Sequence, residues 1–253
     1  MIKQYKLLLS PQKGLNSRFD PCDAYALYGS LMQALSGEAA ERLHSSDEPQ
    51  IAHYLTPVCG GAKAQWTVSL LASENCPEAA SILGERGEFT LTSKCASLGV
   101  EECKITSLGS LDELLGVAGE DRDCPRFHMR FVSPASFRVE GEYQFFPTVK
   151  HILRSLSSRW NAAFPAVAVS DEDAAAALEN GTRMTGYELK SSYYRLKGNS
   201  IAAFTGSVTL SARLSPPLLQ LLRGLLSFGV FGGVGIKTSL GMGGITLRES
   251  PRK

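Results

Sequence analysis

Two Gly-apolar-Gly steps near the C-terminus constrain this chain more than any other feature. They are Gly233-Val234-Gly235 and Gly241-Met242-Gly243, and the five residues between them include Lys237. Glycine is needed where the backbone takes a positive φ, or where another backbone or a phosphate approaches closely. A helix-like apolar run, 216–228, precedes the steps, and a strand-like run, 245–247, follows them. The sequence therefore predicts a tight glycine-rich loop between a helix and a last strand, either as a plain turn or as a binding loop.

The spacing of this loop differs from that of two common nucleotide-binding loops. A Walker A loop has glycine directly before its Lys-Thr pair, whereas Ile236 precedes Lys237-Thr238 here. A dinucleotide-binding fingerprint needs a third glycine three residues after the second, and Thr238 stands at that position. A nucleotide-binding protein is therefore a disfavoured hypothesis, which measurable ATP binding would revive.

Apolar periodicity and turn residues predict the same order of elements in both halves of the chain. The first half has strands and helices at 2–9, 20–35, 51–58, 65–72, 77–83, 88–96 and 102–108, and a further helix from Ser110. The second half has them at 126–132, 147–164, 183–196, 200–212, 216–228 and 245–247. Each half reads β-α-β-β-α-β, so we predict an α+β fold of two tandem ferredoxin-like domains with a C-terminal glycine-rich loop. The predicted domains are 1–124 and 125–253, joined by a linker at 121–125.

Charge divides unevenly between these halves, although the net charge is only +1. Residues 1–125 carry 10 Lys and Arg against 17 Asp and Glu, so residues 126–253 carry 16 against 8. Such a division suggests a basic face on the second half that meets a polyanion such as RNA. The alternative is an acidic half that docks on a basic half. No apolar run approaches the length of a membrane span, and the chain starts with a strand rather than a signal peptide, which predicts a cytoplasmic protein.

Four histidines are the candidates for proton transfer near neutral pH, namely His44, His53, His128 and His151. His44 stands in a polar stretch after the first helix, and His53 lies within an alternating strand. The six cysteines have irregular spacing and form no CxxC pair, and no HExxH or paired-carboxylate motif is present. The sequence therefore predicts neither a metal nor another cofactor.

The glycine loop, with its preceding helix and its C-terminal place, resembles the signature of a known protein family. That family is the CRISPR-associated repeat-RNA-processing endoribonucleases, the sixth Cas family of the repeat-associated mysterious protein (RAMP) superfamily. The segments 130–137, 146–161 and 203–210 are also similar to its strand-Ser-Pro segment, its Pro-led helix and its Gly-containing strand. The resemblance covers about half of the chain and implies the same tandem ferredoxin-like fold.

In this family a catalytic His lies in a Leu-His-polar stretch before a strand that ends in Ser/Thr-Pro. Residues 43–47 followed by 55–57 match that pattern, so the resemblance implies His44 as the catalytic residue, with His53 as second choice. The first helix of the family often supplies a tyrosine, which implies Tyr28, although a core tyrosine fits that position equally. The family's lysine shortly after the His is missing, because the next lysine is Lys63. Arg42, Lys63 and Lys237 are the alternatives for the positive charge.

RNA contacts are expected from the glycine loop and from basic residues of the second half. Lysine and arginine neutralise a phosphate backbone and position it. The predicted RNA-binding residues are Gly233, Gly235, Lys237, Thr238, Gly241, Gly243, Lys150, Arg154, Lys190, Arg195 and Lys197.

The resemblance implies a metal-independent endoribonuclease that cuts CRISPR precursor RNA within its repeats to give guide RNAs. Attack of the ribose 2′-OH on the adjacent phosphate would leave a 2′,3′-cyclic phosphate and a 5′-OH. The partner is then CRISPR repeat RNA, the second candidate partner is a CRISPR effector complex, and the protein is a monomer or a homodimer without a membrane partner. The alternative hypothesis is a non-catalytic RNA-binding subunit of such an effector complex.

Overall fold

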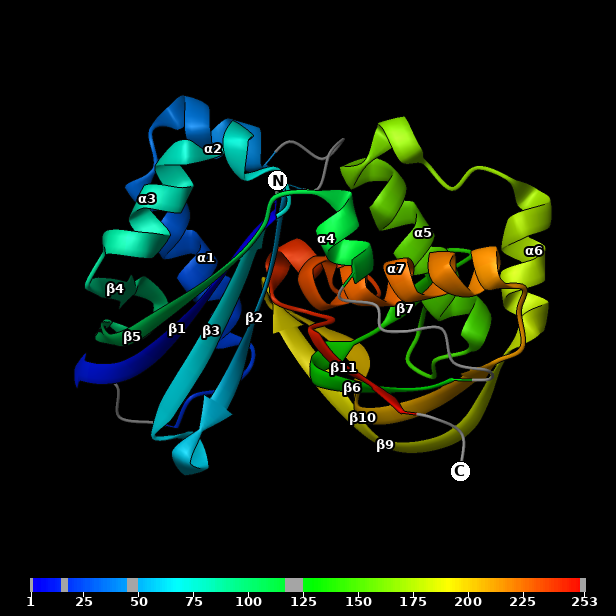
Figure 1. Cartoon of the computed structure of the whole chain (residues 1–253). Helices are drawn as coiled ribbons and strands as arrows, with labels where there is room; N and C mark the ends of the chain where they lie inside the picture. The colour runs from blue at the N-terminus through cyan, green and yellow to red at the C-terminus, as the bar shows by residue number, and fades with distance from the viewer. Residues whose placement is uncertain (1, 15–17, 45–49, 117–124, 251–253) are drawn as a thin grey trace.

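The computed structural model describes residues 2–14, 18–44, 50–116 and 125–250, and Figure 1 shows how its elements are arranged. Two antiparallel sheets lie side by side, and helices cover one face of each of them (Figure 1). The first half contains β1 (Ile2–Lys13), α1 (Asp23–Ala34), α2 (Gly37–His44), β2 (Ile51–Val58), β3 (Lys63–Leu70), α3 (Pro77–Glu85), β4 (Glu88–Leu91), β5 (Ala96–Leu108) and α4 (Leu111–Gly116). Short 3-10 turns stand at Cys59–Gly61, Ser73–Asn75 and Thr92–Lys94.

The first sheet has the strand order β2-β3-β1-β5-β4. Alternate residues of β1, among them Leu7 and Leu9, are buried in a core that α1 and α3 complete. The predicted strand 88–96 is interrupted, because Cys95 takes a left-handed φ of 48° and the chain turns there. The next strand is longer than the predicted 102–108, because β5 begins at Ala96 and pairs with β1 from Ile2 to Lys13.

The second half has a similar plan, with a small hairpin added after its first strand. Its elements are β6 (Arg126–Ala135), β7 (Phe137–Val139), β8 (Glu142–Gln144), α5 (Val149–Ala163), α6 (Glu172–Gly181), β9 (Thr182–Leu196), β10 (Asn199–Ala212), α7 (Pro216–Gly232) and β11 (Ile245–Ser250), with 3-10 turns at Pro165–Val167 and Thr238–Leu240. The small β7–β8 hairpin was not predicted. Its strands are three residues long and mostly exposed, so they carry no alternating apolar pattern.

The second sheet has the strand order β11-β6-β10-β9, and its core lies between β6, β10 and the helices α5 and α7. β9 and β10 form a long hairpin across Lys197 and Gly198, whose φ values of 49° and 80° suit a two-residue hairpin turn. In the first sheet β1 lies between β3 and β5, and in the second sheet β6 lies between β10 and β11, as the first strand of a ferredoxin-like unit lies between its third and its last strand. The prediction of an α+β fold with two tandem ferredoxin-like units is confirmed.

The predicted domain boundary at 124/125 lies next to residues 117–124, which are outside the described residues, so the division into domains stays a prediction. In the described part of the chain, no helix is both long enough and apolar enough to cross a membrane.

Candidate functional site

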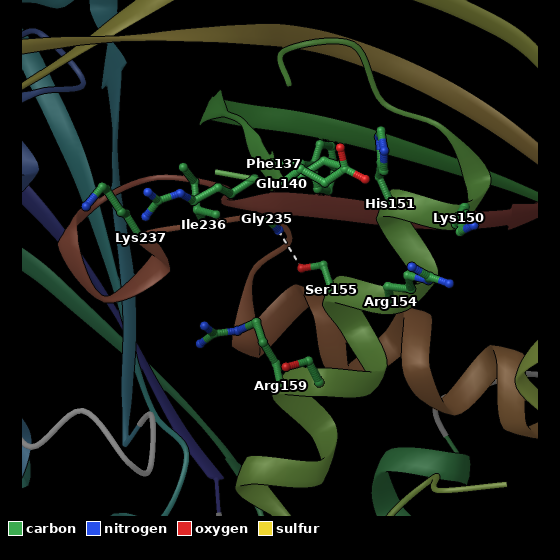
Figure 2. A pocket seen from close by; sticks show the side chains of 13 residues that line it. Phe137, Glu140, Lys150, His151, Arg154, Ser155, Arg159, Gly235, Ile236 and Lys237 are labelled. Atoms are coloured by element: carbon green, nitrogen blue, oxygen red, sulfur yellow. Dashed lines mark hydrogen bonds between the residues drawn. The ribbon is translucent and has the colours of Figure 1, made fainter. Parts of the chain in front are cut away.

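The glycine loop, residues 233–244, lies at the junction of the two halves and connects α7 to β11. Its backbone amides are largely bonded within the protein. Those of Val234 and Gly243 donate to the carbonyl oxygens of Gly243 and Pro134, at 2.8 and 2.9 Å. The amide of Gly235 donates to the Ser155 hydroxyl on α5 at 2.7 Å (Figure 2). The loop is therefore a braced structure whose conformation is set by β6 and α5.

The predicted RNA-contacting glycines pack against protein atoms. Gly241 has a φ of 104°, and a Cβ there would overlap the Tyr194 hydroxyl and lie 2.7 Å from the Ala24 Cβ. Gly235 lies against the Ser136 carbonyl, and Gly233 and Gly243 lie against the side chain of Thr238. These glycines allow close approach of protein rather than of a phosphate, and their contact with RNA stays a prediction.

Thr238 is buried beneath the loop, with 1% of its surface exposed. Its methyl group packs against Gly233 and Gly243, and its hydroxyl has no hydrogen-bond partner among the described residues. A direct side-chain contact from Thr238 to RNA is therefore at odds with this structure. Lys237 beside it is part-exposed and takes a left-handed φ of 53°.

The second part of the loop contacts both halves of the chain. The Tyr194 hydroxyl on β9 donates to the Leu240 carbonyl at 2.6 Å, and burial raises the pKa of Tyr194 above its usual range. The imidazole Nε2 of His53 on β2 lies 3.0 Å from the Ser239 carbonyl oxygen. The loop thus joins a strand of the first sheet to a strand of the second.

Both ring nitrogens of His53 have hydrogen-bond partners in this junction. The indole N–H of Trp66 can only donate, so the Nδ1 of His53, 3.4 Å away, must accept. The proton then lies on Nε2, which donates to Ser239. Burial lowers the pKa of His53 to about 4, which keeps the ring neutral at physiological pH. His53 therefore holds the loop in place, and a role in proton transfer would require it to leave both partners.

Tyr28 lies on α1 with its ring stacked on His53, with 5.3 Å between the ring centroids. It also lines a cavity of about 510 Å³, called here the α1 pocket. The α1 pocket is lined by Tyr25, Ala26, Tyr28, Gly29, Ser30, Met32, Gln33, Thr92, Lys197 and Leu240. The structure thus brings predicted catalytic Tyr28 and predicted RNA-binding Lys197 together beside the glycine loop.

His44, the other predicted catalytic residue, is the last residue of α2. Its backbone is described, but its side chain and the following residues 45–49 lie outside the described residues. The preceding Leu43 is buried in the core of the first half. The catalytic role of His44 accordingly stays a prediction.

A second and larger cavity, of about 810 Å³, borders the loop at Gly235, Ile236 and Lys237 and is called here the α5 pocket. The α5 pocket is lined by Phe137, Arg138, Val139, Glu140, Lys150, His151, Arg154, Ser155, Ser158, Arg159, Gly235, Ile236 and Lys237 (Figure 2). Three predicted basic residues, Lys150, Arg154 and Lys237, line this pocket. Arg138 was missed, because the β7 strand that carries it has no sequence signal.

The remaining predicted RNA-binding residues lie on β9. Lys190 and Arg195 are exposed, and Arg195 pairs across the junction with Asp20 at 3.3 Å. Neither of them lines either pocket. The predicted RNA-binding set is therefore distributed over the α5 pocket, the α1 pocket and the outer surface of β9.

The second sheet also has a basic face, and its arginines were not among the predicted RNA-binding residues. Cross-strand pairing places Arg126 and Arg130 of β6 near Arg248 of β11 and Arg183 of β9, with serine and threonine residues between them. In the described part of the chain, no ion pair involves any of these four arginines. The basic character of residues 126–253 is the only sequence signal for this face.

Comparison with known proteins places these features in a family. Residues 129–245 match the family model described as CRISPR-associated endoribonuclease Cas6. A curated Cas6 endoribonuclease of Streptococcus thermophilus is 32% identical over 227 residues, which is 89% of this chain and 91% of that protein. A Mycobacterium tuberculosis Cas6 endoribonuclease is 22% identical over 229 residues, or 90% of this chain and 72% of that protein.

Solved structures of the same family have the same fold. Thermus thermophilus Cas6 (TTHB231) superposes with a TM-score of 0.74 at 20% identity, over 98% of both chains. A Cas6 (TTHA0078) product complex superposes with a TM-score of 0.75 at 23% identity, over 98% of this chain and 100% of that chain. With the identity to the Streptococcus relative along most of both sequences, these findings show that the chain belongs to the Cas6 family of CRISPR-associated endoribonucleases.

Proposed function

We propose that this protein is a metal-independent endoribonuclease that cuts CRISPR precursor RNA within its repeats to release guide RNAs. The observation that carries the proposal is the 32% identity to a Cas6 endoribonuclease over 89% of the chain. The geometry supports it, because a tyrosine, a lysine and the braced glycine loop border one pocket at the junction of the two halves.

The proposed reaction uses the RNA's own nucleophile. A base removes the proton of a ribose 2′-OH, and the 2′ oxygen attacks the adjacent phosphorus in line. The bond from phosphorus to the 5′ oxygen of the next nucleotide breaks, and an acid protonates that oxygen. The products are a 2′,3′-cyclic phosphate and a 5′-OH. Because proton transfer alone drives these steps, no metal ion is required for them.

We assign the base to His44 and the proton donor to Tyr28. Burial raises the pKa of Tyr28 above the ordinary value for tyrosine, so its hydroxyl carries a proton at neutral pH and can act as the donor but not as the base. Lys197 in the same pocket would stabilise negative charge on the phosphate in the transition state. In this proposal residues 1–124 supply the base and the proton donor, and residues 125–253 supply Lys197 and most of the RNA contacts.

RNA binding is assigned to the exposed basic residues that the structure describes. Lys150, Arg154 and Lys237 border the α5 pocket, whereas Lys190 and Arg195 extend the basic surface along β9. The glycines of the loop hold this arrangement together, because they let the loop pack on both halves. The expected partner is the repeat RNA itself.

A cleavage assay in EDTA tests the proposal. The wild type, His44→Ala and His53→Gln are mixed with repeat RNA from the same genome, and with that RNA carrying a 2′-deoxy sugar at the cut site. We expect cutting by the wild type and by His53→Gln, and no cutting by His44→Ala or of the deoxy substrate. A 3′ end that can be ligated only after its cyclic phosphate has been opened and removed, and a 5′ end that a kinase labels without prior dephosphorylation, would identify the 2′-OH reaction.

The other outcomes have distinct meanings. Cutting that needs added Mg²⁺ would contradict metal independence. Activity retained in His44→Ala but lost in His53→Gln would move the base to His53. Intact RNA in every lane, together with a shifted band on a native gel, would instead identify a non-catalytic RNA-binding subunit of an effector complex.

A further inference from the structure

The lining of the α5 pocket carries a surplus of basic side chains. Five cationic side chains line it against a single carboxylate, Glu140. The cationic residues are Arg138, Lys150, Arg154, Arg159 and Lys237. Part of this charge is already neutralised, because Arg154 at the rim pairs with Glu179 at 3.3 Å. The pocket still offers an excess of positive charge to an anion.

Arg159 differs from the other four. Its Nε and Nη2 atoms are shielded from solvent and have no hydrogen-bond partner among the described residues. The residue as a whole is only part-buried, so its guanidinium opens on the pocket at one edge. Burial lowers its pKa to about 10, which leaves the group charged at neutral pH. A buried charged donor without an acceptor is costly, and an anion in the pocket would remove that cost.

The local structure holds Arg159 in this place. It lies one helical turn after Ser155, whose hydroxyl accepts the Gly235 amide and fixes the loop to the same face of α5. In Figure 2, the side chains of Arg159 and Lys237 extend to the same side, one from α5 and the other from the loop. Lys150 and Arg154 point to the opposite side, and Glu140 lies near His151, away from Arg159 (Figure 2).

We propose that the α5 pocket is a phosphate-binding site in which Arg159 is the anchor and Lys237 the second cation. The planar guanidinium fork of Arg159 matches two oxygens of a phosphate, and Lys237 adds a point charge from the loop. The source of the phosphate is either the RNA backbone, in which case the inference rests on the proposed function, or a free phosphate or mononucleotide.

The first measurement is the affinity for uncleavable 2′-deoxy repeat RNA as a function of salt. Arg159→Gln is expected to weaken binding about 10- to 100-fold, the usual effect of losing a charge-assisted contact. It should also reduce the slope of log K against log salt by about 1. Arg159→Lys should recover part of the affinity. Arg86→Gln removes the same charge from an exposed position on the first half and should change binding less than about twofold.

The second measurement locates the phosphate. Neutral methylphosphonates replace the RNA phosphates one at a time, and each RNA is bound to the wild type and to Arg159→Gln. At the phosphate that Arg159 contacts, the methylphosphonate and Arg159→Gln together should lower the RNA affinity no more than either change alone. Coupling at one phosphate or at two adjacent ones supports the RNA source. Additive losses at every position would overturn it.

The third measurement decides for a free ligand. Inorganic phosphate and a nucleoside monophosphate are titrated into the wild type and Arg159→Gln while the melting temperature is recorded. A rise that only the wild type shows would support the phosphate site with a free ligand, even if RNA does not couple to Arg159. No coupling to an RNA phosphate and no rise in melting temperature specific to the wild type together overturn the proposal.

A wild type that fails to bind RNA refutes the proposed function. The titration with free phosphate then still tests whether the α5 pocket binds an anion. If Arg159→Gln does not fold, Lys237→Gln takes its place in all three measurements.

Discussion

The ring of Tyr28 lies stacked on the imidazole of His53, with 5.3 Å between the centroids and 15° between the planes. One residue comes from α1 and the other from β2, and the His53 ring reaches on to the glycine loop at Ser239. The predicted catalytic tyrosine is thus positioned by a neutral histidine that also anchors the loop. A change in the charge of His53 should therefore affect both neighbours.

We expect stability to fall as the pH is lowered from 6.5 towards 4. His53 has a pKa of about 4 in the folded protein against 6.5 in the unfolded chain, so the unfolded state binds the proton first. The stabilising contribution of neutral His53 is complete above pH 6.5 and is lost as the pH falls through 4. It amounts to about 3 kcal/mol in the free energy of unfolding. Urea unfolding of the wild type at a series of pH values measures it.

His53→Gln is the control for this prediction, because glutamine keeps an amide donor for Ser239 and does not titrate. Its stability should change less than that of the wild type over the same pH range. Parallel curves for the two proteins would show that other groups cause the acid sensitivity.

Tyr28→Phe should lower the single-turnover cleavage rate about 100-fold, because it removes the proposed proton donor. The melting temperature should stay nearly unchanged, since phenylalanine preserves the stack on His53. Tyr25→Phe is the matched control, because Tyr25 lines the same α1 pocket. A rate loss in Tyr25→Phe with full activity in Tyr28→Phe would transfer the role to Tyr25.

Gly241→Ala should destabilise the protein by about 3 kcal/mol. The new Cβ would meet the Tyr194 hydroxyl and Ala24 at a φ of 104°, so backbone strain and overpacking add. Gly141→Ala separates the two effects, because Gly141 has a φ of 89° but open space around it. We expect about 1 kcal/mol there, from urea unfolding midpoints. Equal losses at both positions would rule out a packing role for Gly241.

Lys190→Gln should reduce the salt dependence of RNA binding, with a slope of log K against log salt lower by about 1. Lys190 is exposed on β9 and has no ion pair among the described residues, so its charge is available to a phosphate. Lys104→Gln, on the first half beside Glu102, is the control and should leave the slope unchanged. An unchanged slope in Lys190→Gln would place the RNA elsewhere.

Local patterns in the sequence predict the elements that bury a regular apolar face. The α1 helix, the β9–β10 hairpin and the tandem order follow from periodicity and turn residues, because burial selects the same spacing wherever such elements form. The interruption at Cys95 and the β7–β8 hairpin do not follow. Neither has a repeating pattern, and both depend on what the chain packs against.

The candidate site too is predicted in part by local sequence and decided in part by packing. The sequence indicates a basic α5 through Lys150 and Arg154, and it indicates a tight loop through the glycines. Whether those glycines face a phosphate or another part of the protein depends on contacts from distant segments, and the structure places Tyr194 and Ser136 against them. The role of His53 also depends on the tertiary structure, because only the packing of distant segments buries it between Trp66 and Ser239.

By itself the sequence determined the order of the elements, the C-terminal place of the glycine loop and the surplus of basic residues in the second half. Each of these is a property of neighbouring residues or of composition. The tertiary structure alone decided that Arg159, whose Nε and Nη2 have no hydrogen-bond partner in the described part of the chain, shares a pocket with Lys237, and that Tyr28, Lys197 and Leu240 share another. Those residues are distant along the chain, and only the packing of the two sheets around the loop brings them together.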